Sequence, residues 1–314
     1  MERVRVRLHN IQMQLRVVVM SDNGLIQIEP HTLHKYSILR KYLNVCKTFN
    51  RIYNNFVYVD THGGSGRVSL KSNGQLIEGS PLIASHWNPN APCHIVEIDP
   101  NTYQNLCAST SGCDNVQTYH GDCNSWILSI LSKITKWKKF VFCFVDPSSL
   151  TYTVDGKVYD QLQAGTIKAV ADFPRTELLL NFPLEAILRC AGDYFNNPEE
   201  PRAIANGERV TVFMGSTNWQ KLSERERDRR TFLELYMDEM LRNYPYKGAM
   251  LIRSETKNLP LYYLVYTTHN DTAAGIMRGI MKKEGNFPLH YKLTGEPQTL
   301  DEIYPLTRFV FEEK

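Results

Sequence analysis

The sequence predicts an α/β fold built on a mostly parallel, doubly wound sheet, and three observations predict it. Short apolar runs alternate with segments of helical periodicity through most of the chain. Repeated strand–helix units form parallel sheets, because each helical crossover returns the chain to the same edge. Towards the C-terminus, two apolar runs are separated only by a short turn, so we expect the sheet to include an antiparallel strand.

The elements follow in a regular order. Residues 1–30 are expected to form a β extension, with two short strands on either side of Ser21-Asp22-Asn23-Gly24. In the first of these, Arg3, Arg5 and Arg7 share one face, as a solvated edge or a nucleic-acid contact. From Thr32 the apolar period becomes helical. The expected strands are 57–59, 94–98, 116–119, 140–145 and 178–182, and the expected helices between them are 81–87, 101–109, 125–136 and 158–170.

Residues 184–245 lose this alternation and are expected to form a helical insertion within one domain spanning 31–314. Inside the insertion, Ser223-Glu224-Arg225-Glu226 has the pattern of a capping box and predicts a helix running to Met240. Strands at 249–253 and 261–267 and a helix at 272–283 complete the expected order.

Composition narrows the class of protein. The chain has 314 residues, of which 42% are hydrophobic and 22% charged, as in soluble globular proteins. A net charge of +3 neither requires nor excludes a polyanionic partner. Seven cysteines without a CxxC pair indicate a reducing compartment, and we find no apolar run long enough to span a membrane, so a cytoplasmic location is expected. His31 and His34 lack a third ligand nearby, so no metal site is expected.

A glycine-rich segment follows the first buried strand, in the stretch VYVDTHGGSGR. Glycines let the backbone approach a ligand without an intervening side chain. A dinucleotide loop needs a further glycine and a helix that begins at once to receive the pyrophosphate. Here the next helix signal, Ser80-Pro81, comes about a dozen residues later. The loop therefore favours S-adenosylmethionine (AdoMet), which carries no phosphate. Its expected ligands here are Asp60, Gly63, Gly64, Gly66 and Ser80.

Acidic residues follow the next two strands at the same expected edge. Glu97 ends the strand HIVE and is placed to accept both ribose hydroxyls of a nucleoside. Asp99 either assists Glu97 or caps the following helix. Asp122, next to Cys123, either reaches the adenine amino group or caps a helix. Glu97, Asp99, Asp122 and Cys123 complete the expected cofactor site.

Several blocks together resemble one known family, the three-Cys-motif partner proteins, which are similar to class I AdoMet methyltransferases. The blocks are HKYSILRKYL, VYVDTHGGSGR, EGSPLIA, IVEIDP, FVDPSSL and ELLLNFP, over roughly residues 31–190. The resemblance implies a Rossmann-like class I methyltransferase fold, AdoMet as cofactor, and partnership with a three-cysteine, radical-AdoMet-like protein. Two blocks depart from the family: His62-Gly63 stands for Ala-Gly, and DPSS for D-P-F-G.

The fourth strand ends in Asp146-Pro147-Ser148-Ser149, which suits methyl transfer to an exocyclic amine of a nucleic-acid base. The lone pair of such an amine is delocalised into the ring, which makes the nitrogen a poor nucleophile. When a carboxylate and a main-chain carbonyl accept its two N–H groups, the electron density on the nitrogen rises. An aromatic side chain then stacks on the extruded base. The candidate catalytic residues are Asp146, Pro147 and Asn181, and the candidate substrate contacts are Ser148, Tyr152 and Phe182.

The basic segment KLSERERDRR admits two interpretations. Its mixed signs are typical of an exposed helix with ion pairs along one face, or else Arg225 and Arg229 meet phosphates. A methyltransferase acting on nucleic acid is the function that we expect. The alternatives are an AdoMet-fold adaptor without activity, favoured by Ser148-Ser149 in place of an aromatic residue, and an NAD-dependent oxidoreductase, disfavoured by the missing glycine.

Overall fold

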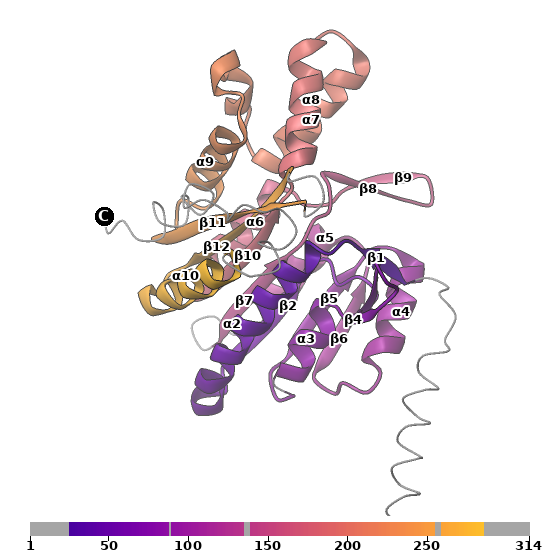
Figure 1. The fold of residues 1–314 in the computed structure, drawn as a ribbon, viewed down its shortest axis with the longest axis vertical. Helices are drawn as coiled ribbons and strands as arrows, with labels where there is room; N and C mark the ends of the chain where they lie inside the picture. Colours follow the sequence, from indigo (N-terminus) through magenta and orange to yellow (C-terminus); the bar gives the residue numbers. More distant parts are fainter. Residues whose placement is uncertain (1–24, 88, 135–138, 255–258, 286–314) are drawn as a thin grey trace, which may run out of the picture.

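The computed structural model describes residues 25–87, 89–134, 139–254 and 259–285, so most of the expected β extension, with Arg3, Arg5 and Arg7, lies outside the described residues. A seven-stranded sheet forms the centre, in the order β11-β12-β10-β7-β2-β5-β6 (Figure 1). Its strands are β2 (Phe56–Asp60), β5 (Cys93–Glu97), β6 (Val116–His120), β7 (Phe140–Val145), β10 (Thr176–Phe182), β11 (Tyr246–Arg253) and β12 (Pro260–Thr268).

The sheet order confirms the predicted fold class. The chain enters the sheet at β2 in the middle, runs outward to β6, and returns through β7 to β10 on the other side of β2. Strand β12 then pairs antiparallel with both β10 and β11, between which it is inserted. A parallel sheet with this single reversed strand is the Rossmann-like class I methyltransferase fold.

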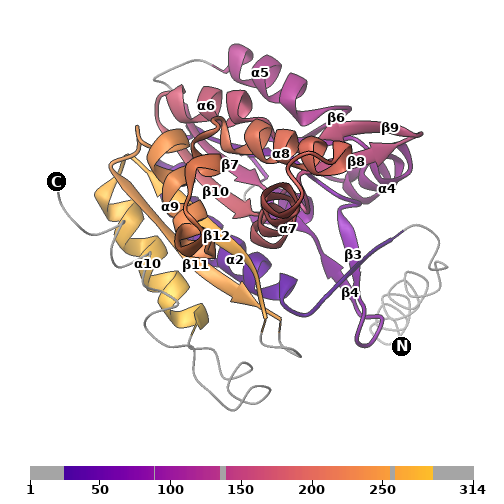
Figure 2. The same cartoon turned by 90° about the horizontal axis from the view of Figure 1, so that it is seen from above.

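Helices cover both faces of the sheet, because its strands are apolar on both sides. In β2, Phe56 and Tyr58 belong to one buried cluster, and Val57 and Val59 belong to the other. Figure 2 shows α2 and α10 on one side of the sheet and α5 and α6 on the other. The helices on the first side are α2 (Thr32–Tyr53), α3 (Ser80–Trp87), α4 (Pro100–Thr110) and α10 (Asp271–Gly285); those on the second are α5 (Cys123–Lys133), α6 (Ala164–Asp172) and α9 (Arg229–Met240). None of these described helices combines the length and the apolar character that crossing a membrane requires.

A small second sheet includes the segment between the glycine loop and α3 together with a strand that precedes α2. It contains β1 (Ile26–Ile28), β3 (Arg67–Leu70) and β4 (Leu76–Glu78), with β1 parallel to β3 and β3 antiparallel to β4. The strands expected from the sequence do not include residues 67–78, where β3 and β4 have only four and three residues. Their pairing brings β1 beside the glycine loop, next to the carboxyl edge of the central sheet.

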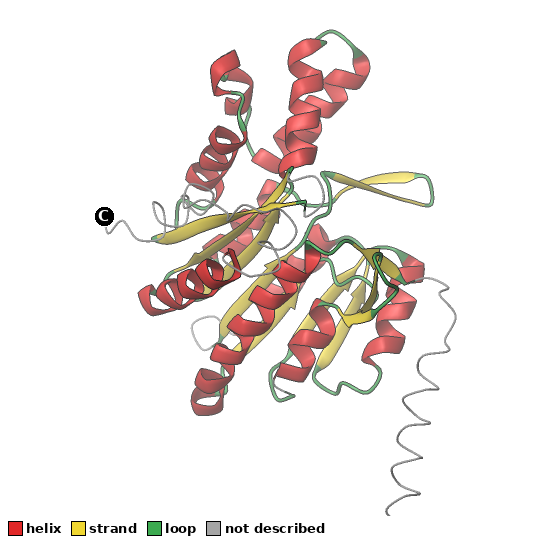
Figure 3. Cartoon of the chain, viewed as in Figure 1, coloured by secondary structure: helices red, strands yellow, loops and turns green. Residues whose placement is uncertain are grey.

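The helix predicted at 158–170 is wrong at its beginning. Residues 151–160 form a hairpin of β8 (Thr151–Val154) and β9 (Lys157–Asp160), and α6 begins only at Ala164. Asp155 and Gly156 have φ of 49° and 76°, the left-handed pair that a tight Asp-Gly hairpin turn requires. Figure 3 shows this hairpin projecting from the domain.

Between β10 and β11 the chain forms α7 (Leu184–Asn196), α8 (Pro201–Met214), the short 3-10 helices η1 (Asn218–Lys221) and η2 (Glu224–Glu226), and α9. The predicted capping box is present, but it caps the start of η2 instead of the start of the long helix. A separate cap starts α9, since Asp228 accepts the main-chain N–H groups of Arg230 and Thr231. Figure 1 shows α7 and α8 side by side above the central sheet, next to the β8–β9 hairpin.

Candidate functional site

A cavity of about 740 Å³ lies at the carboxyl ends of the parallel strands. This edge is where open α/β sheets bind ligands, and the volume is within the usual range for small-molecule sites. Residues of β1, of the first turn of α2 and of the β8–β9 hairpin close its sides. Of the predicted site residues, the lining includes Gly63, Gly64, Glu97, Asp122, Cys123, Asp146, Pro147, Ser148, Tyr152 and Asn181.

The glycines of the loop are needed for close packing as well as for access of a ligand to the backbone. A Cβ on Gly63 would lie 2.3 Å from Ile95 Cγ2, so only glycine fits between β2 and β5. Gly64 has φ of 61°, and its N–H donates to Glu97 Oε2 at 2.8 Å. The loop is therefore held against the end of β5, with its backbone facing the cavity.

Glu97 is the acidic group best placed for a nucleoside. Its Oε1 accepts the Asp99 N–H at 2.9 Å, and the Ile98 main chain also hydrogen-bonds the carboxylate, so main-chain donors orient Glu97 at the cavity wall. Burial raises the pKa of Glu97 against the lowering effect of these hydrogen bonds. Its remaining acceptor capacity faces the cavity, where it can serve the hydroxyls of a ribose.

Several predicted cofactor ligands lie behind the cavity wall instead of lining it. Asp60 is fully buried, accepts from Tyr58 and from the His62 N–H, and is hydrogen-bonded by Ser80. Burial raises the pKa of Asp60 to about 7. Asp99 caps α4 by accepting the Thr102 N–H at 2.7 Å. Asp60, Gly66, Ser80 and Asp99 thus shape the loops, and the prediction that they contact the cofactor is not supported by their positions.

The helix cap predicted as one role for Asp122 is present, and the residue also borders the cavity. It caps α5, with Oδ1 accepting the N–H and the side-chain amide of Asn124, and it also lines the cavity. Cys123 lines the cavity beside it and donates from Sγ to the Gln161 carbonyl at 3.1 Å. Burial raises the pKa of the Cys123 thiol, so it is held in the neutral form.

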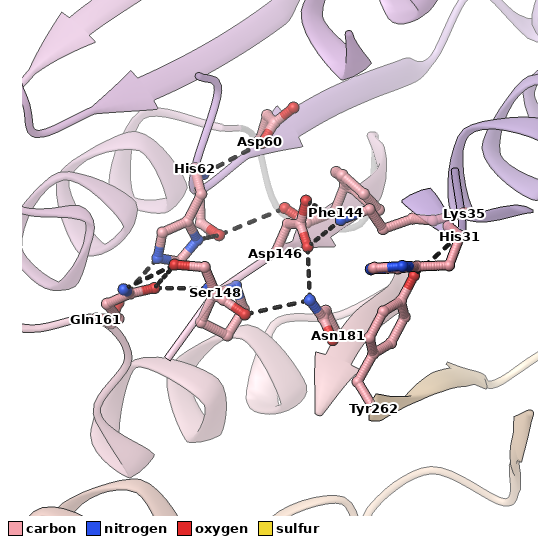
Figure 4. Close-up of polar contacts among 12 residues, drawn as sticks. His31, Lys35, Asp60, His62, Phe144, Asp146, Ser148, Gln161, Asn181 and Tyr262 are labelled. Carbon is pink, nitrogen blue, oxygen red and sulfur yellow. Dashed lines mark hydrogen bonds and ion pairs between the residues drawn. The ribbon is translucent and has the colours of Figure 1, made fainter. Parts of the chain in front are cut away.

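The acceptor end of the cavity centres on Asp146, which has a partner that the sequence did not identify. Lys35 of α2 donates from Nζ to both carboxylate oxygens, at 2.6 Å to Oδ1 and 2.5 Å to Oδ2 (Figure 4). Its ammonium also lies 5.8 Å from the ring centroids of Tyr36 and Tyr262. The Lys35 side chain is 8% exposed and that of Asp146 is 14% exposed, so the pair is largely buried at the cavity wall and its charges compensate each other.

Asn181 spans the two acceptors that were predicted to hold a substrate amine. Its Nδ2 donates to Asp146 Oδ1 at 2.9 Å and to the Pro147 carbonyl at 3.2 Å. The Asp146 carboxylate and the Pro147 carbonyl can only accept hydrogen bonds, so the side-chain amide of Asn181 must point its nitrogen towards them. Its Oδ1 is buried and has no hydrogen-bond partner among the described residues.

Gln161, which follows β9, fixes the loop after Asp146. Its Oε1 accepts the N–H of Ser148 at 2.7 Å and of Ser149 at 3.3 Å, and its Nε2 donates to Ser148 Oγ. Its carbonyl lies 3.1 Å from His62 Nε2, which therefore donates. Burial lowers the pKa of His62 to about 4, so this histidine is neutral near pH 7.

Two predicted aromatic contacts are placed differently. Phe182 is fully buried against Phe213 and Tyr236, so its predicted role in stacking on a substrate is wrong. Tyr152 pairs across the hairpin with Tyr159, and both line the cavity. Burial, and to a lesser extent the charges of Asp99 and Glu97, raise the pKa of Tyr152, so its phenol stays neutral.

The predicted phosphate contacts also lie elsewhere. Arg225 and Arg229 are exposed on η2 and at the start of α9, and neither lines this cavity. Of the residues that the sequence did not identify, Lys35 had a usable signal: it is a charged residue on the apolar side of α2, four residues before the buried Leu39. Tyr159 and Gln161 were missed because residues from 158 onward were predicted as a helix, although Asp155-Gly156 is a hairpin-turn signal just before them.

Comparison with known proteins adds likenesses in fold. No family model and no curated protein matches the chain. Among solved structures, LPL1258 from Legionella pneumophila is 12% identical, with a TM-score of 0.49, over 78% of this chain and 89% of that one. The O-methyltransferase from Bacillus cereus in complex with SAH is 12% identical, with a TM-score of 0.36, over 83% and 90%. Spermidine synthase from Thermotoga maritima is 8% identical, with a TM-score of 0.39, over 87% and 71%. Because these identities and TM-scores are low, we take no activity from them.

Proposed function

We propose that the protein is an AdoMet-dependent methyltransferase that acts on an exocyclic amine of a nucleic-acid base. One observation carries this proposal: Asp146 Oδ1 and the Pro147 carbonyl both accept from the same nitrogen, Asn181 Nδ2. That nitrogen is a planar NH₂ whose lone pair is delocalised, as in the amino group of a base. The two acceptors thus already converge on a nitrogen of the type to be methylated.

The cavity supports AdoMet as the cofactor. Glu97 keeps acceptor capacity towards the cavity for ribose hydroxyls, and the Gly63–Gly64 backbone leaves room beside it. Tyr152 and Tyr159 also line the cavity and offer aromatic surface to a purine. Asp122 offers a carboxylate to an adenine amino group. When bound, AdoMet supplies a methyl group on a sulfonium, which is already a strong electrophile.

The chain's own residues supply position and electrostatics. In this proposal the substrate amine displaces Asn181 Nδ2 and donates its two N–H groups to Asp146 and Pro147, which enriches its lone pair. Lys35 holds the carboxylate through both oxygens, and Gln161 holds the loop that carries the Pro147 carbonyl. Such preorganised groups need no rearrangement of solvent during the reaction.

The same contacts favour one alternative. Asp146 Oδ1 already accepts from both Lys35 and Asn181, and Ser148-Ser149 supplies no aromatic side chain. A carboxylate satisfied in this way suits an adaptor that keeps the fold and binds AdoMet without transferring its methyl group. The family resemblance identified in the sequence gives such an adaptor a candidate partner, a three-Cys-motif radical-AdoMet-like protein.

The experiment that separates the two functions follows methyl label from AdoMet into candidate acceptors: single-stranded RNA, single-stranded DNA, tRNA and protein. The proposal predicts label in a nucleic acid. Tight AdoMet binding in calorimetry with no labelled acceptor would favour the adaptor, and label in protein alone would retain the enzyme class but reject the substrate.

A further inference from the structure

A second cavity, of about 700 Å³, opens beside the first. Residues of α7 and α8 and of the loop leading into β8 line it, and Ser149 and Arg189 line both cavities. A chain-like ligand can therefore occupy the two cavities together, with one group at Asp146 and its neighbours between α7 and α8.

The lining of the second cavity is polar and positively charged. Three arginines stand against a single carboxylate, Asp193, and amide side chains fill much of the remaining wall. Asp193 is already bound, by Asn206 Nδ2 at 2.6 Å and by Arg202 Nε at 3.4 Å. The lining arginines are Arg189, Arg202 and Arg209, and the amides are Asn196, Asn197 and Asn206. The cavity thus offers many N–H donors and an excess of positive charge.

Each arginine keeps donors for a ligand. Arg202 has a side chain that is 83% exposed, and its recorded ion pair uses only Nε. Arg209 donates from Nη1 to Asn206 Oδ1 at 2.8 Å, which orients the guanidinium and leaves its other N–H groups. Arg189 is exposed; its side chain is hydrogen-bonded to Cys190, and its other N–H groups remain for a ligand.

We propose that the second cavity binds the phosphodiester backbone of a single-stranded polynucleotide, next to the nucleotide whose base enters the first cavity. This inference rests on the proposed function and names the substrate's second contact. Guanidinium groups bind phosphate oxygens in paired hydrogen bonds, and amide N–H groups complete such sites. A single strand is favoured because its bases reach Asp146 without the cost of leaving a duplex stack.

The proposed site differs from the basic segment KLSERERDRR, for which phosphate contacts were one of two interpretations of the sequence. Arg225 and Arg229 line neither cavity, and Arg229 is hydrogen-bonded to Tyr263. The arginines that border the acceptor site are instead distributed over α7 and α8, and they do not form a run of basic residues in the sequence.

The test compares binding of a fluorescein-labelled single-stranded oligonucleotide, as RNA and as DNA, by fluorescence anisotropy from about 50 to 200 mM salt. The variant is Arg202→Gln with Arg209→Gln. The matched control, Lys47→Gln with Arg51→Gln, removes the same charge from exposed positions near the far end of α2, with Arg51 about 24 Å along the helix from Lys35. AdoMet calorimetry and circular dichroism check that each variant is folded, and Arg202→Gln alone serves if Arg209→Gln disturbs α8.

The expected result is binding weakened tenfold or more by the cavity variant, because each lost charged hydrogen bond contributes at least a factor of about ten. The slope of log affinity against log salt should become less steep by about 1.4 units. The control variant should change neither the affinity nor this slope by much. Equal losses in variant and control, unchanged binding in the variant, or no binding by the wild type would each overturn the inference.

These outcomes remain separate from those of the proposed function, since the binding assay needs no methyl transfer. Arginine-dependent binding without methylation would keep this site and reject the enzyme. Methylation of a polynucleotide that is unaffected in Arg202→Gln with Arg209→Gln would keep the enzyme and reject this site.

Discussion

Lys35 Nζ lies within 2.6 Å of both carboxylate oxygens of Asp146, joining the first turn of α2 to the end of β7. The pair closes one side of the acceptor site and determines how variants of Asp146 must be interpreted. Removing the carboxylate removes an acceptor for the substrate amine, and it also leaves a buried ammonium without its counter-charge.

The buried ion pair predicts a large loss of stability from Asp146→Ala. The free energy of unfolding should fall by about 3–5 kcal/mol, because one partner of a buried pair is left unpaired. Adding Lys35→Met should recover most of this loss. As a control, Lys71→Met breaks the exposed pair with Glu29 and should change stability little, because solvent screens such pairs. Denaturant unfolding measures all four proteins, and a double variant no more stable than Asp146→Ala would refute the pairing.

Asn181 occupies the position proposed for the substrate amine, so removing its side chain should help the substrate to bind. For Asn181→Ala we expect the KM for the nucleic-acid acceptor to fall by up to about tenfold, the equivalent of one competing hydrogen bond to a charged acceptor. Asn181→Asp should raise the KM, since a second carboxylate would repel Asp146. Steady-state methylation at saturating AdoMet measures both, and a loss of kcat in Asn181→Ala without a fall in KM would make Asn181 part of the reaction machinery.

Asp60 predicts a difference in the pH dependence of stability between the wild type and Asp60→Asn. Its folded pKa of about 7 lies above its unfolded value, so between about pH 4 and 7 the folded protein retains a proton that the unfolded chain releases. Wild-type stability should therefore fall relative to Asp60→Asn as pH rises, by up to about 1.4 kcal/mol per unit, and level off above pH 7. The lowered pKa values of His31 and His62 act in the opposite direction, but they are common to both proteins and cancel. Denaturant unfolding at several pH values checks this, and parallel curves would contradict it.

Glu97 and Asp99 should differ in their effect on AdoMet affinity. Glu97→Ala removes the acceptor for two ribose hydroxyls and should weaken AdoMet binding by tenfold or more. Asp99→Asn keeps the cap on α4 and lies outside the cavity, so it should stay within a few fold of the wild type. Calorimetry with AdoMet and with NAD makes the comparison. Equal losses in the two variants, or binding of NAD without AdoMet, would reject the cofactor site described here.

The sequence predicted the parts of this protein that depend on local pattern. The alternation of apolar runs located the central strands, and the polar residues after them located Glu97, Asp122 and Asp146 on one edge of the sheet. It could not predict relationships across the chain. Lys35 and Asp146 are 111 residues apart, and only the packing of α2 against the sheet brings them together. An Asp-Gly turn did mark the β8–β9 hairpin, but the apolar residues around it were interpreted as the start of a helix.

The most direct test of the central claim identifies the atom that receives the methyl group. Single-stranded RNA and DNA are incubated with AdoMet carrying a deuterated methyl group, digested to nucleosides and analysed by mass spectrometry against N-methylated standards. Wild-type protein should place the heavy methyl group on an exocyclic amine. The Lys35→Met, Asp146→Ala variant, once shown by calorimetry to bind AdoMet, should transfer at least about 10²-fold less. A heavy methyl group on a ring atom or a 2′-hydroxyl, or equal transfer by the variant, would contradict the account.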